Sequence, residues 1–159
     1  MIVLDCVSES PLWDQRPQME ALAQRALLHA AQQCGHVFMD GAEISLLLVD
    51  DTQMRALNHQ WRDQDKPTNV LSFQSVPPER LATAPVLGDI ILAYETVDRE
   101  AQDENKTFDD HASHLIVHGF LHLIGHDHMN DEEADLMEGL ETRILAELGI
   151  ADPYADEAH

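Results

Sequence analysis

Apolar residues fall into short runs and into stripes at helical spacing, and together they predict a chain of mixed strands and helices. Runs with the length and composition of buried strands cover residues 2–7, 44–49, 70–73 and 89–93. Stripes with a helical period predict helices at about residues 17–34, 51–61, 95–104, 107–124 and 130–149. Because several helices follow one another without a strand between them, we expect an α+β fold with a small mixed β-sheet packed with several helices.

The length of the chain and the composition of its first residues set the organisation that we expect. Its 159 residues suit a single domain over 1–159, with a frayed tail after about residue 150. The first residues lack a basic segment followed by a long apolar run, and nowhere do roughly 18 apolar residues follow one another. Cys6 and Cys34 form no CxxC pair, so a reducing compartment is the simpler interpretation. We therefore expect a cytoplasmic protein with no membrane partner.

The charge of the chain is strongly acidic, but one segment differs from the rest. A formal net charge of -21 repels polyanions at long range, and by itself it argues against nucleic-acid binding. Between residues 52 and 80 the cations outnumber the acids, with Arg55, Arg62, Lys66 and Arg80 against Asp63, Asp65 and Glu79. If RNA binds to this protein, the segment 52–80 is the best place for its phosphates.

A cluster of histidines is the most informative chemical feature of the chain. His118 and His122 are four residues apart on a predicted helix, so both imidazoles point to the same side. Gly125 then allows a sharp turn, since glycine tolerates positive φ, and the turn can bring His128 back toward the other two. Three imidazoles with one open position form a catalytic zinc site, so we expect one Zn²⁺ per chain on His118, His122 and His128.

The helix that carries these histidines also favours a metal site. Its apolar residues cover a wide arc and predict burial, whereas one stripe is occupied by His111, His114, His118 and His122. A polar stripe on a buried helix needs a partner, and a metal ion is the simplest one. A lone buried histidine is usually a hydrogen-bonded core residue, but two at this spacing and a third after a glycine are typical of ligands.

The third ligand is less constrained than the first two. His126 and His128 both follow the predicted turn, and His114 lies one helical turn before His118. We favour His128 because it leaves room for the chain to loop back, and we expect His126 to be an exposed turn residue. We expect His114 to lie next to the ligands or to face the substrate.

The histidine segment resembles the YbeY family of endoribonucleases, whose hallmark reads approximately HGxLHLxGxDH. All of its fixed letters are present between His118 and His128. The resemblance extends to Asn58 with Trp61 and Arg62, and to the segments 67–73 and 87–90. One departure is Asn69, where family members usually carry Asp. The amide keeps the shape of that side chain and loses its charge, so a role of the carboxylate in ordering the loop or a water is not implied here.

The resemblance implies both an activity and a set of site residues. It implies zinc on His118, His122 and His128, and a single-strand-specific endoribonuclease that acts in 16S rRNA 3′-end maturation and in ribosome quality control. Its partners would be single-stranded ribosomal RNA, a protein of the small ribosomal subunit and an assembly GTPase. A family arginine implicated in activity corresponds to Arg62.

The residues around the expected zinc suggest catalytic roles, and several assignments stay open. The residues that we assign to catalysis are Arg62, His114 and Asp127. Arg62 suits bidentate contacts with the scissile phosphate, although a surface salt bridge with Asp63 or Asp65 is the alternative. Asp127 can orient a histidine, Asp89 is a further candidate for the general base, and the RNA can instead supply its own 2′-hydroxyl as nucleophile.

Two other functions compete with a nuclease. The spacing HxxxHxxGxxH is also that of metzincin proteases, which place a glutamate directly after the first histidine, where this chain has Gly119. A non-enzymatic ribosome-assembly factor is the second rival, because an acidic surface suits a basic ribosomal protein better than bare RNA. A purely structural zinc site closes with four protein ligands, so the three indicated here favour an open catalytic position.

Overall fold

The computed structural model describes residues 1–127 and 129–154, which form one sheet, five longer helices and two short 3₁₀ helices. The strands β1 to β4 cover Val3–Ser8, Glu43–Val49, Val70–Gln74 and Val86–Ala93. The helices α1 to α5 cover Met19–Gln33, Asp51–Arg62, Tyr94–Asp103, Phe108–Leu123 and Asp131–Glu147. The 3₁₀ helices η1 and η2 cover Pro11–Gln15 and Pro78–Thr83. The predicted strands and helices are therefore confirmed, with bounds that differ by a few residues.

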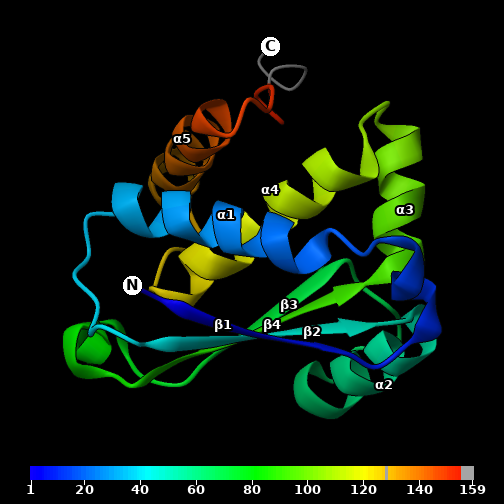
Figure 1. Cartoon of the computed structure of the whole chain (residues 1–159), viewed down its shortest axis with the longest axis horizontal. Helices are drawn as coiled ribbons and strands as arrows, with labels where there is room; N and C mark the ends of the chain where they lie inside the picture. The colour runs from blue at the N-terminus through cyan, green and yellow to red at the C-terminus, as the bar shows by residue number, and fades with distance from the viewer. Residues whose placement is uncertain (128, 155–159) are drawn as a thin grey trace.

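The four strands form one mixed sheet in the order β1-β2-β4-β3 (Figure 1). Strands β1, β2 and β4 run parallel to one another, whereas β3 pairs antiparallel with β4 at one edge. This confirms the predicted α+β fold with a small mixed sheet. The strand order was not predictable from the local pattern, because it depends on crossovers between segments that are distant in the sequence.

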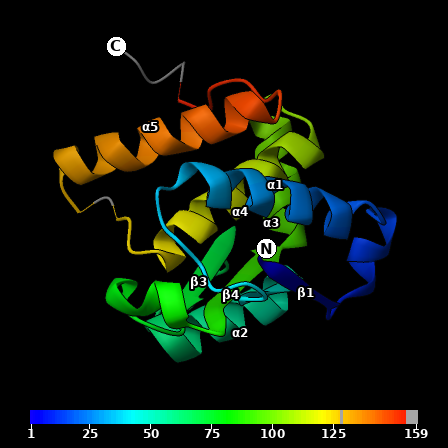
Figure 2. The ribbon, with the colours of Figure 1, turned by 60° about the vertical axis from the view of Figure 1, so that its left-hand side comes forward.

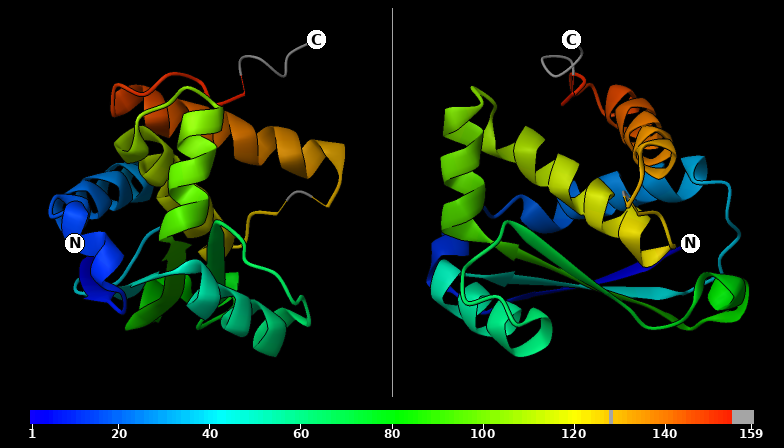
Figure 3. Two further views of the ribbon diagram at one scale, coloured as in Figure 1. Left: turned by 90° about the vertical axis from the view of Figure 1, so that its right-hand side faces the viewer. Right: turned by 180° about the vertical axis from the view of Figure 1, so that it is seen from behind.

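Helices cover both faces of the sheet, but unequally. Helices α1, α4 and α5 lie above one face and α2 lies against the other, as two opposite views show (Figures 1 and 3). Alternate residues of β4 point to opposite faces, so Ile90 and Leu92 join the large core under α4, while Ile91 joins a small core under α2. The large core also holds Ile44 and Leu46 of β2.

Helix α4 occupies the centre of the larger layer. It packs on β3 and β4 below and against α1, α3 and α5, and Figure 2 shows α5 passing over it. Its N-terminus is capped by Thr107, whose hydroxyl accepts a hydrogen bond from the backbone N–H of Asp110. Val117, Phe120 and Leu121 are fully buried, which confirms the predicted burial of the histidine-bearing helix.

Two further features concern membrane-spanning helices and the two cysteines. Among the described residues, no helix has both the length and the apolar character that a membrane crossing needs. Cys6 and Cys34 are free thiols, and burial raises the pKa of both.

Candidate metal centre

Four histidines follow one another along α4. The ring centroids of His111 and His114 are 6.2 Å apart, those of His114 and His118 are 6.3 Å apart, and those of His118 and His122 are 4.6 Å apart. This row results from spacings of three and four residues, which place side chains on one face of a helix. The rings are closest at the C-terminal end of the row, where α4 reaches a groove.

The two rings at that end present the same nitrogen to each other. Nε2 of His118 lies 3.1 Å from Nε2 of His122. A tetrahedral ion with metal–nitrogen bonds of about 2.0–2.1 Å separates two of its ligand nitrogens by about 3.3 Å. The pair therefore fits two ligands of one zinc ion with little adjustment. His118 also keeps part of its side chain accessible, with 24% exposed.

A buried carboxylate from α5 lies behind this pair. Oε1 of Glu141 is 2.7 Å from Nδ1 of His118, and its Oε2 is 2.9 Å from Nε2 of His114. The hydroxyl of Tyr154 donates a hydrogen bond of 2.5 Å to the same Oε2. Burial raises the pKa of Glu141, but the hydrogen bonds from His114, His118 and Tyr154 outweigh it and lower the pKa to about 2. Glu141 is therefore an ionised carboxylate in the interior.

These residues also define a second way to hold a metal. Ligand atoms of His114, His118 and Glu141 all lie within 4.8 Å of one another, so this group can hold an ion. The 2.7 Å between Nδ1 of His118 and Glu141 is, however, the length of a charge-assisted hydrogen bond, shorter than the separation of two ligands on one ion. The distances therefore fit an ion on the Nε2 pair better than an ion on Nδ1.

A similar cluster lies further toward the N-terminus of α4. Nε2 of His111 is 2.9 Å from Oε1 of Glu100, and the side-chain amide of Asn69 donates to the same oxygen at 3.0 Å. Burial raises the pKa of Glu100, but the hydrogen bonds from His111 and Asn69 outweigh it and lower that pKa. Glu104 completes a group that can hold a cation. Asn69 thus acts as a donor to a carboxylate, which an ionised Asp cannot do.

A groove of about 1030 Å³ opens beside the His118–His122 pair. It is lined by residues from the end of α2, the following loop, β3 and the turn after α4, among them Arg62, Lys66, Phe73 and Gln74. The amide of Asn58 holds the loop by donating to the carbonyl of Lys66 at 2.9 Å. Gln74 donates to the carbonyl of His122 at 2.8 Å and joins β3 to α4.

The structure brings most of the expected site residues to this groove. Its lining includes Arg62, His118, His122 and Asp127, which come from α2, from α4 and from the turn that follows α4. The turn contains Gly125 at φ 102, as predicted. His114 is not among the described residues that line the groove, because its ring faces Glu141. His128, the expected third ligand, lies outside the described residues.

Several alternatives can be compared with the observed contacts. Asp65 forms an ion pair with Arg55 at 2.7 Å, and Arg62 instead donates to the carbonyl of Ser72 at 3.4 Å. Asp89 is exposed on β4 and is not among the described residues that line the groove. His126, expected to be exposed, is half-buried, and burial together with the nearby His36 lowers its pKa.

Glu141 is the residue that the sequence pattern did not reveal as part of the site. It occupies a core-facing position of α5 among Met137, Leu140 and Ile144, and it is fully buried. The available signal was a single acid within an apolar stripe. Acids are almost never fully buried unless they are paired, so an acid at this position indicates an ion-pair or hydrogen-bond partner on a neighbouring element.

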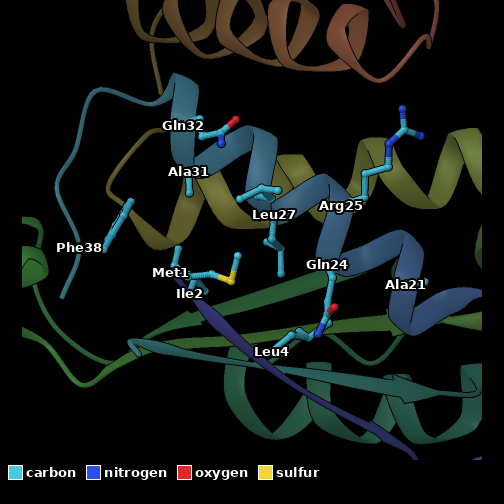
Figure 4. A pocket seen from close by; sticks show the side chains of 11 residues that line it. Met1, Ile2, Leu4, Ala21, Gln24, Arg25, Leu27, Ala31, Gln32 and Phe38 are labelled. Atoms are coloured by element: carbon cyan, nitrogen blue, oxygen red, sulfur yellow. The ribbon is translucent and has the colours of Figure 1, made fainter. Parts of the chain in front are cut away.

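A second hollow differs chemically from the groove. It has a volume of about 510 Å³ and lies between β1 and α1, where Figure 4 shows Leu4, Leu27 and Phe38 lining it. Its described lining includes the cation Arg25 but no imidazole and no carboxylate. Its described lining therefore lacks the imidazole and carboxylate side chains that characterise the groove and the cluster beside it.

The fold and the site define a mixed α+β protein with a histidine–glutamate cluster that could hold a metal ion, beside an open groove. A family model described as Endoribonuclease YbeY matches residues 9–149. The chain belongs to the YbeY endoribonuclease family.

Individual relatives agree with that assignment. An Endoribonuclease YbeY of Bradyrhizobium diazoefficiens is 52% identical over 98% of this chain and 84% of its own length. One of Allorhizobium ampelinum is 52% identical over 94% of this chain and 92% of its own length. The solution structure of TM1509 from Thermotoga maritima has the same fold, with a TM-score of 0.58 and 24% identity over 95% of this chain and 98% of that one.

Proposed function

We propose that this protein is a zinc-dependent, single-strand-specific endoribonuclease of the cytoplasm that acts in 16S rRNA 3′-end maturation and in ribosome quality control. The observation that carries the proposal is the pair of Nε2 atoms 3.1 Å apart beside a groove that Arg62 also lines. Membership in the YbeY family supports ribonuclease activity, and the fit of the histidine pair to a tetrahedral ion supports the metal.

Zinc is assigned to His118, His122 and His128. The first two fit the ion by distance, and His128 is assigned from its place after the turn at Gly125. When bound, zinc supplies a Lewis acid for a phosphoryl oxygen and a water whose pKa falls to about 7. Asp127 adjoins His128 in the sequence and lines the groove, and we assign it to orienting a ligand histidine. His114 lies next to the ligands through Glu141.

The scissile phosphate is assigned to Arg62. Its guanidinium lies on the groove and forms no ion pair with a described carboxylate, so its charge is available to an anion. Lys66 lines the same groove. A planar guanidinium can hold two phosphate oxygens at once, which fixes the orientation of the phosphodiester.

An exposed aromatic side chain supports a single-stranded substrate. Trp61 is 63% exposed, and its ring centroid lies 6.1 Å from that of Phe73, which lines the groove. Unpaired bases stack on such rings, and this contact is not available to a base inside a duplex. The acidic remainder of the surface suits a basic protein of the small ribosomal subunit, and an assembly GTPase is the further partner that we propose.

A metzincin-like protease is disfavoured by packing as well as by sequence. A Cβ atom at Gly119 would lie 3.1 Å from Cγ2 of Ile90 and 3.4 Å from Cγ2 of Val70. A side chain at this position would meet β3 and β4 closely, and glycine supplies no carboxylate there. The non-enzymatic assembly factor stays as the second candidate, because the acidic surface favours protein contacts.

Cleavage of a 3′-extended 16S rRNA tests the proposal, with the RNA free and within a small-subunit precursor particle. Wild type should cut, and His122→Ala and Arg62→Ala should lose the cut. Arg55→Ala should retain it, because Arg55 is paired with Asp65. Equal cleavage by wild type and His122→Ala would indicate a contaminating nuclease, and no cleavage of either substrate by wild type would favour the assembly factor.

A further inference from the structure

The fully buried Glu141 needs an explanation that the proposed reaction does not give. Its side chain is 0% exposed and belongs to an otherwise apolar stripe of α5. In the described part of the chain, its ion-pair partners are the imidazoles of His114 and His118, with no lysine or arginine among them. A buried carboxylate is costly unless its oxygens are satisfied, so its retention at this position points to a role for its contacts.

The contacts of Glu141 use both of its oxygens. Oε1 faces Nδ1 of His118 at 2.7 Å, while Oε2 faces Nε2 of His114 at 2.9 Å and accepts from the Tyr154 hydroxyl at 2.5 Å. Three partners, two imidazoles from α4 and one hydroxyl from the segment after α5, therefore fix the plane of the carboxylate. A carboxylate accepts hydrogen bonds and cannot donate them, so the proton of His118 lies on Nδ1.

This arrangement determines how His118 can bind a metal. With its proton on Nδ1, the neutral ring presents a lone pair at Nε2, which faces Nε2 of His122 at 3.1 Å. The carboxylate also increases the basicity of the ring and restricts its rotation. Glu141 thereby selects the nitrogen, the tautomer and the orientation that the proposed metal centre requires.

We propose that Glu141 is a positioning residue that prepares His118 for the metal, with His114 and Tyr154 holding its carboxylate in place. This inference rests on the proposed metal centre. It makes α5 and Tyr154 part of that centre, although neither supplies a ligand from the groove. It also gives His114 a supporting role, since its ring faces Glu141 rather than the groove.

The affinity of the purified protein for Zn²⁺, measured by competition with a chromophoric chelator, tests this role. Glu141→Gln keeps the shape of the side chain and removes its charge, and the affinity should fall about 10- to 100-fold. The absorption spectrum of the Co²⁺-loaded variant should also shift, because the orientation of one ligand changes. Two glutamate–histidine pairs provide controls: Glu147→Gln, beside His29 at the far end of α5, and Glu100→Gln, beside His111. Both should bind as wild type does.

Two outcomes separate this inference from the proposed function. If His122→Ala abolishes Zn²⁺ binding while Glu141→Gln leaves affinity and spectrum unchanged, the positioning role is wrong and the metal centre stands. If His122→Ala binds Zn²⁺ as wild type does, the metal centre itself is wrong. Where Glu141→Gln does not fold, Tyr154→Phe decides, because it removes one hydrogen bond to Glu141. A weaker affinity than wild type then supports the role, and an unchanged affinity contradicts it.

Discussion

Helix α4 supplies histidines to two clusters, and in each cluster an imidazole pairs with a carboxylate from a neighbouring helix. The two clusters differ in whether they reach the groove. The Glu141 cluster consists of Glu141, His114, His118 and Tyr154, and the Glu100 cluster consists of Glu100, His111 and Asn69. Each holds an ionised carboxylate against an imidazole at hydrogen-bond distance. Of the two, the Glu141 cluster alone continues to an imidazole that lines the groove, that of His122.

The choice of ring nitrogen accounts for the difference. Glu141 faces Nδ1 of His118, so Nε2 at the tip of the ring points on to His122. Glu100 faces Nε2 of His111, and Nδ1 of His111 is buried with no hydrogen-bond partner among the described residues. The Glu141 cluster therefore has a ring nitrogen that reaches another imidazole and an accessible space, and in the described part of the chain the Glu100 cluster does not.

The largest expected difference between the clusters is in Zn²⁺ binding, when one imidazole is removed from one cluster or from the other in separate variants. His118→Ala should abolish stoichiometric Zn²⁺ binding, because it deletes one of the two nitrogens that fit the ion. His111→Ala should keep Zn²⁺ binding at one ion per chain and lose only stability, because its ring lies in the Glu100 cluster. Metal analysis of the dialysed proteins measures both, and the comparison fails if His111→Ala is the variant that loses its zinc.

The second largest effect is expected in the pH dependence of stability, measured on protein that a chelator keeps free of metal. Lowering the pH should affect the contributions of the two clusters to the free energy of unfolding to different extents. The pKa of Glu141 is about 2 in the folded chain and 4.5 is its ordinary value. A carboxyl group whose pKa falls on folding adds stability above its unfolded pKa, and this stability is lost as the pH falls toward the folded pKa. Wild type should therefore exceed Glu141→Gln in free energy of unfolding by on the order of 3 kcal/mol at pH 7, and the gap should close below pH 4.5.

Urea unfolding at pH 7, 5 and 3 measures this gap. Glu100→Gln should show a smaller gap of the same sign, because the side chain of Glu100 is 33% exposed and its pKa is lowered less strongly. A difference between wild type and Glu141→Gln that is the same at all three pH values would contradict the assigned ionisation of Glu141.

The groove beside the Glu141 cluster should respond to an aromatic substitution. Trp61→Ala removes an exposed ring next to Phe73, and affinity for single-stranded RNA should fall by about 1–3 kcal/mol, or roughly 5- to 150-fold. Trp61→Phe keeps a ring and should retain most of the affinity. Fluorescence anisotropy with a labelled single strand measures both, and equal affinity of Trp61→Ala and wild type would exclude the stacking contact.

The smallest effect is expected in the Glu100 cluster. Asn69→Asp replaces the amide donor to Glu100 with a second carboxylate, so the protein should lose about 1 kcal/mol of stability at pH 7. The loss should shrink in acid, as one of the two carboxyl groups takes up a proton. Thermal unfolding at pH 7 and pH 4 measures this, and a stabilised Asn69→Asp variant would show that the amide is not the preferred partner of Glu100.

Local sequence patterns predicted the parts of this molecule that depend on neighbours along the chain. The helical period and the glycine turn at Gly125 placed His118 and His122 correctly on α4. Glu141 escaped prediction because it lies 23 residues from His118 in sequence, and only the packing of α5 on α4 brings them together. The sheet order depends on long crossovers in the same way.

Trp61 shows the limit of periodicity at the end of a helix. It follows Met54 and Leu57 at helical spacing on α2, yet it is largely exposed while Met54 is fully buried. The small core under α2 is built on Val49, Leu71, Ile91 and Ala93, with Phe73 packed against it. The ring of Trp61 lies against Phe73 at the margin of that core. The helical spacing of apolar residues therefore extends one turn beyond the part of α2 that the core covers.

The position of the bound ion tests the central claim most directly. Anomalous X-ray diffraction at the zinc edge, from crystals of the Zn²⁺-loaded protein, would locate it. We predict an ion about 2.0–2.1 Å from Nε2 of both His118 and His122, with Glu141 still on Nδ1 of His118. An ion bonded to Nδ1 of His118 and to Glu141, or one in the Glu100 cluster, would contradict the account.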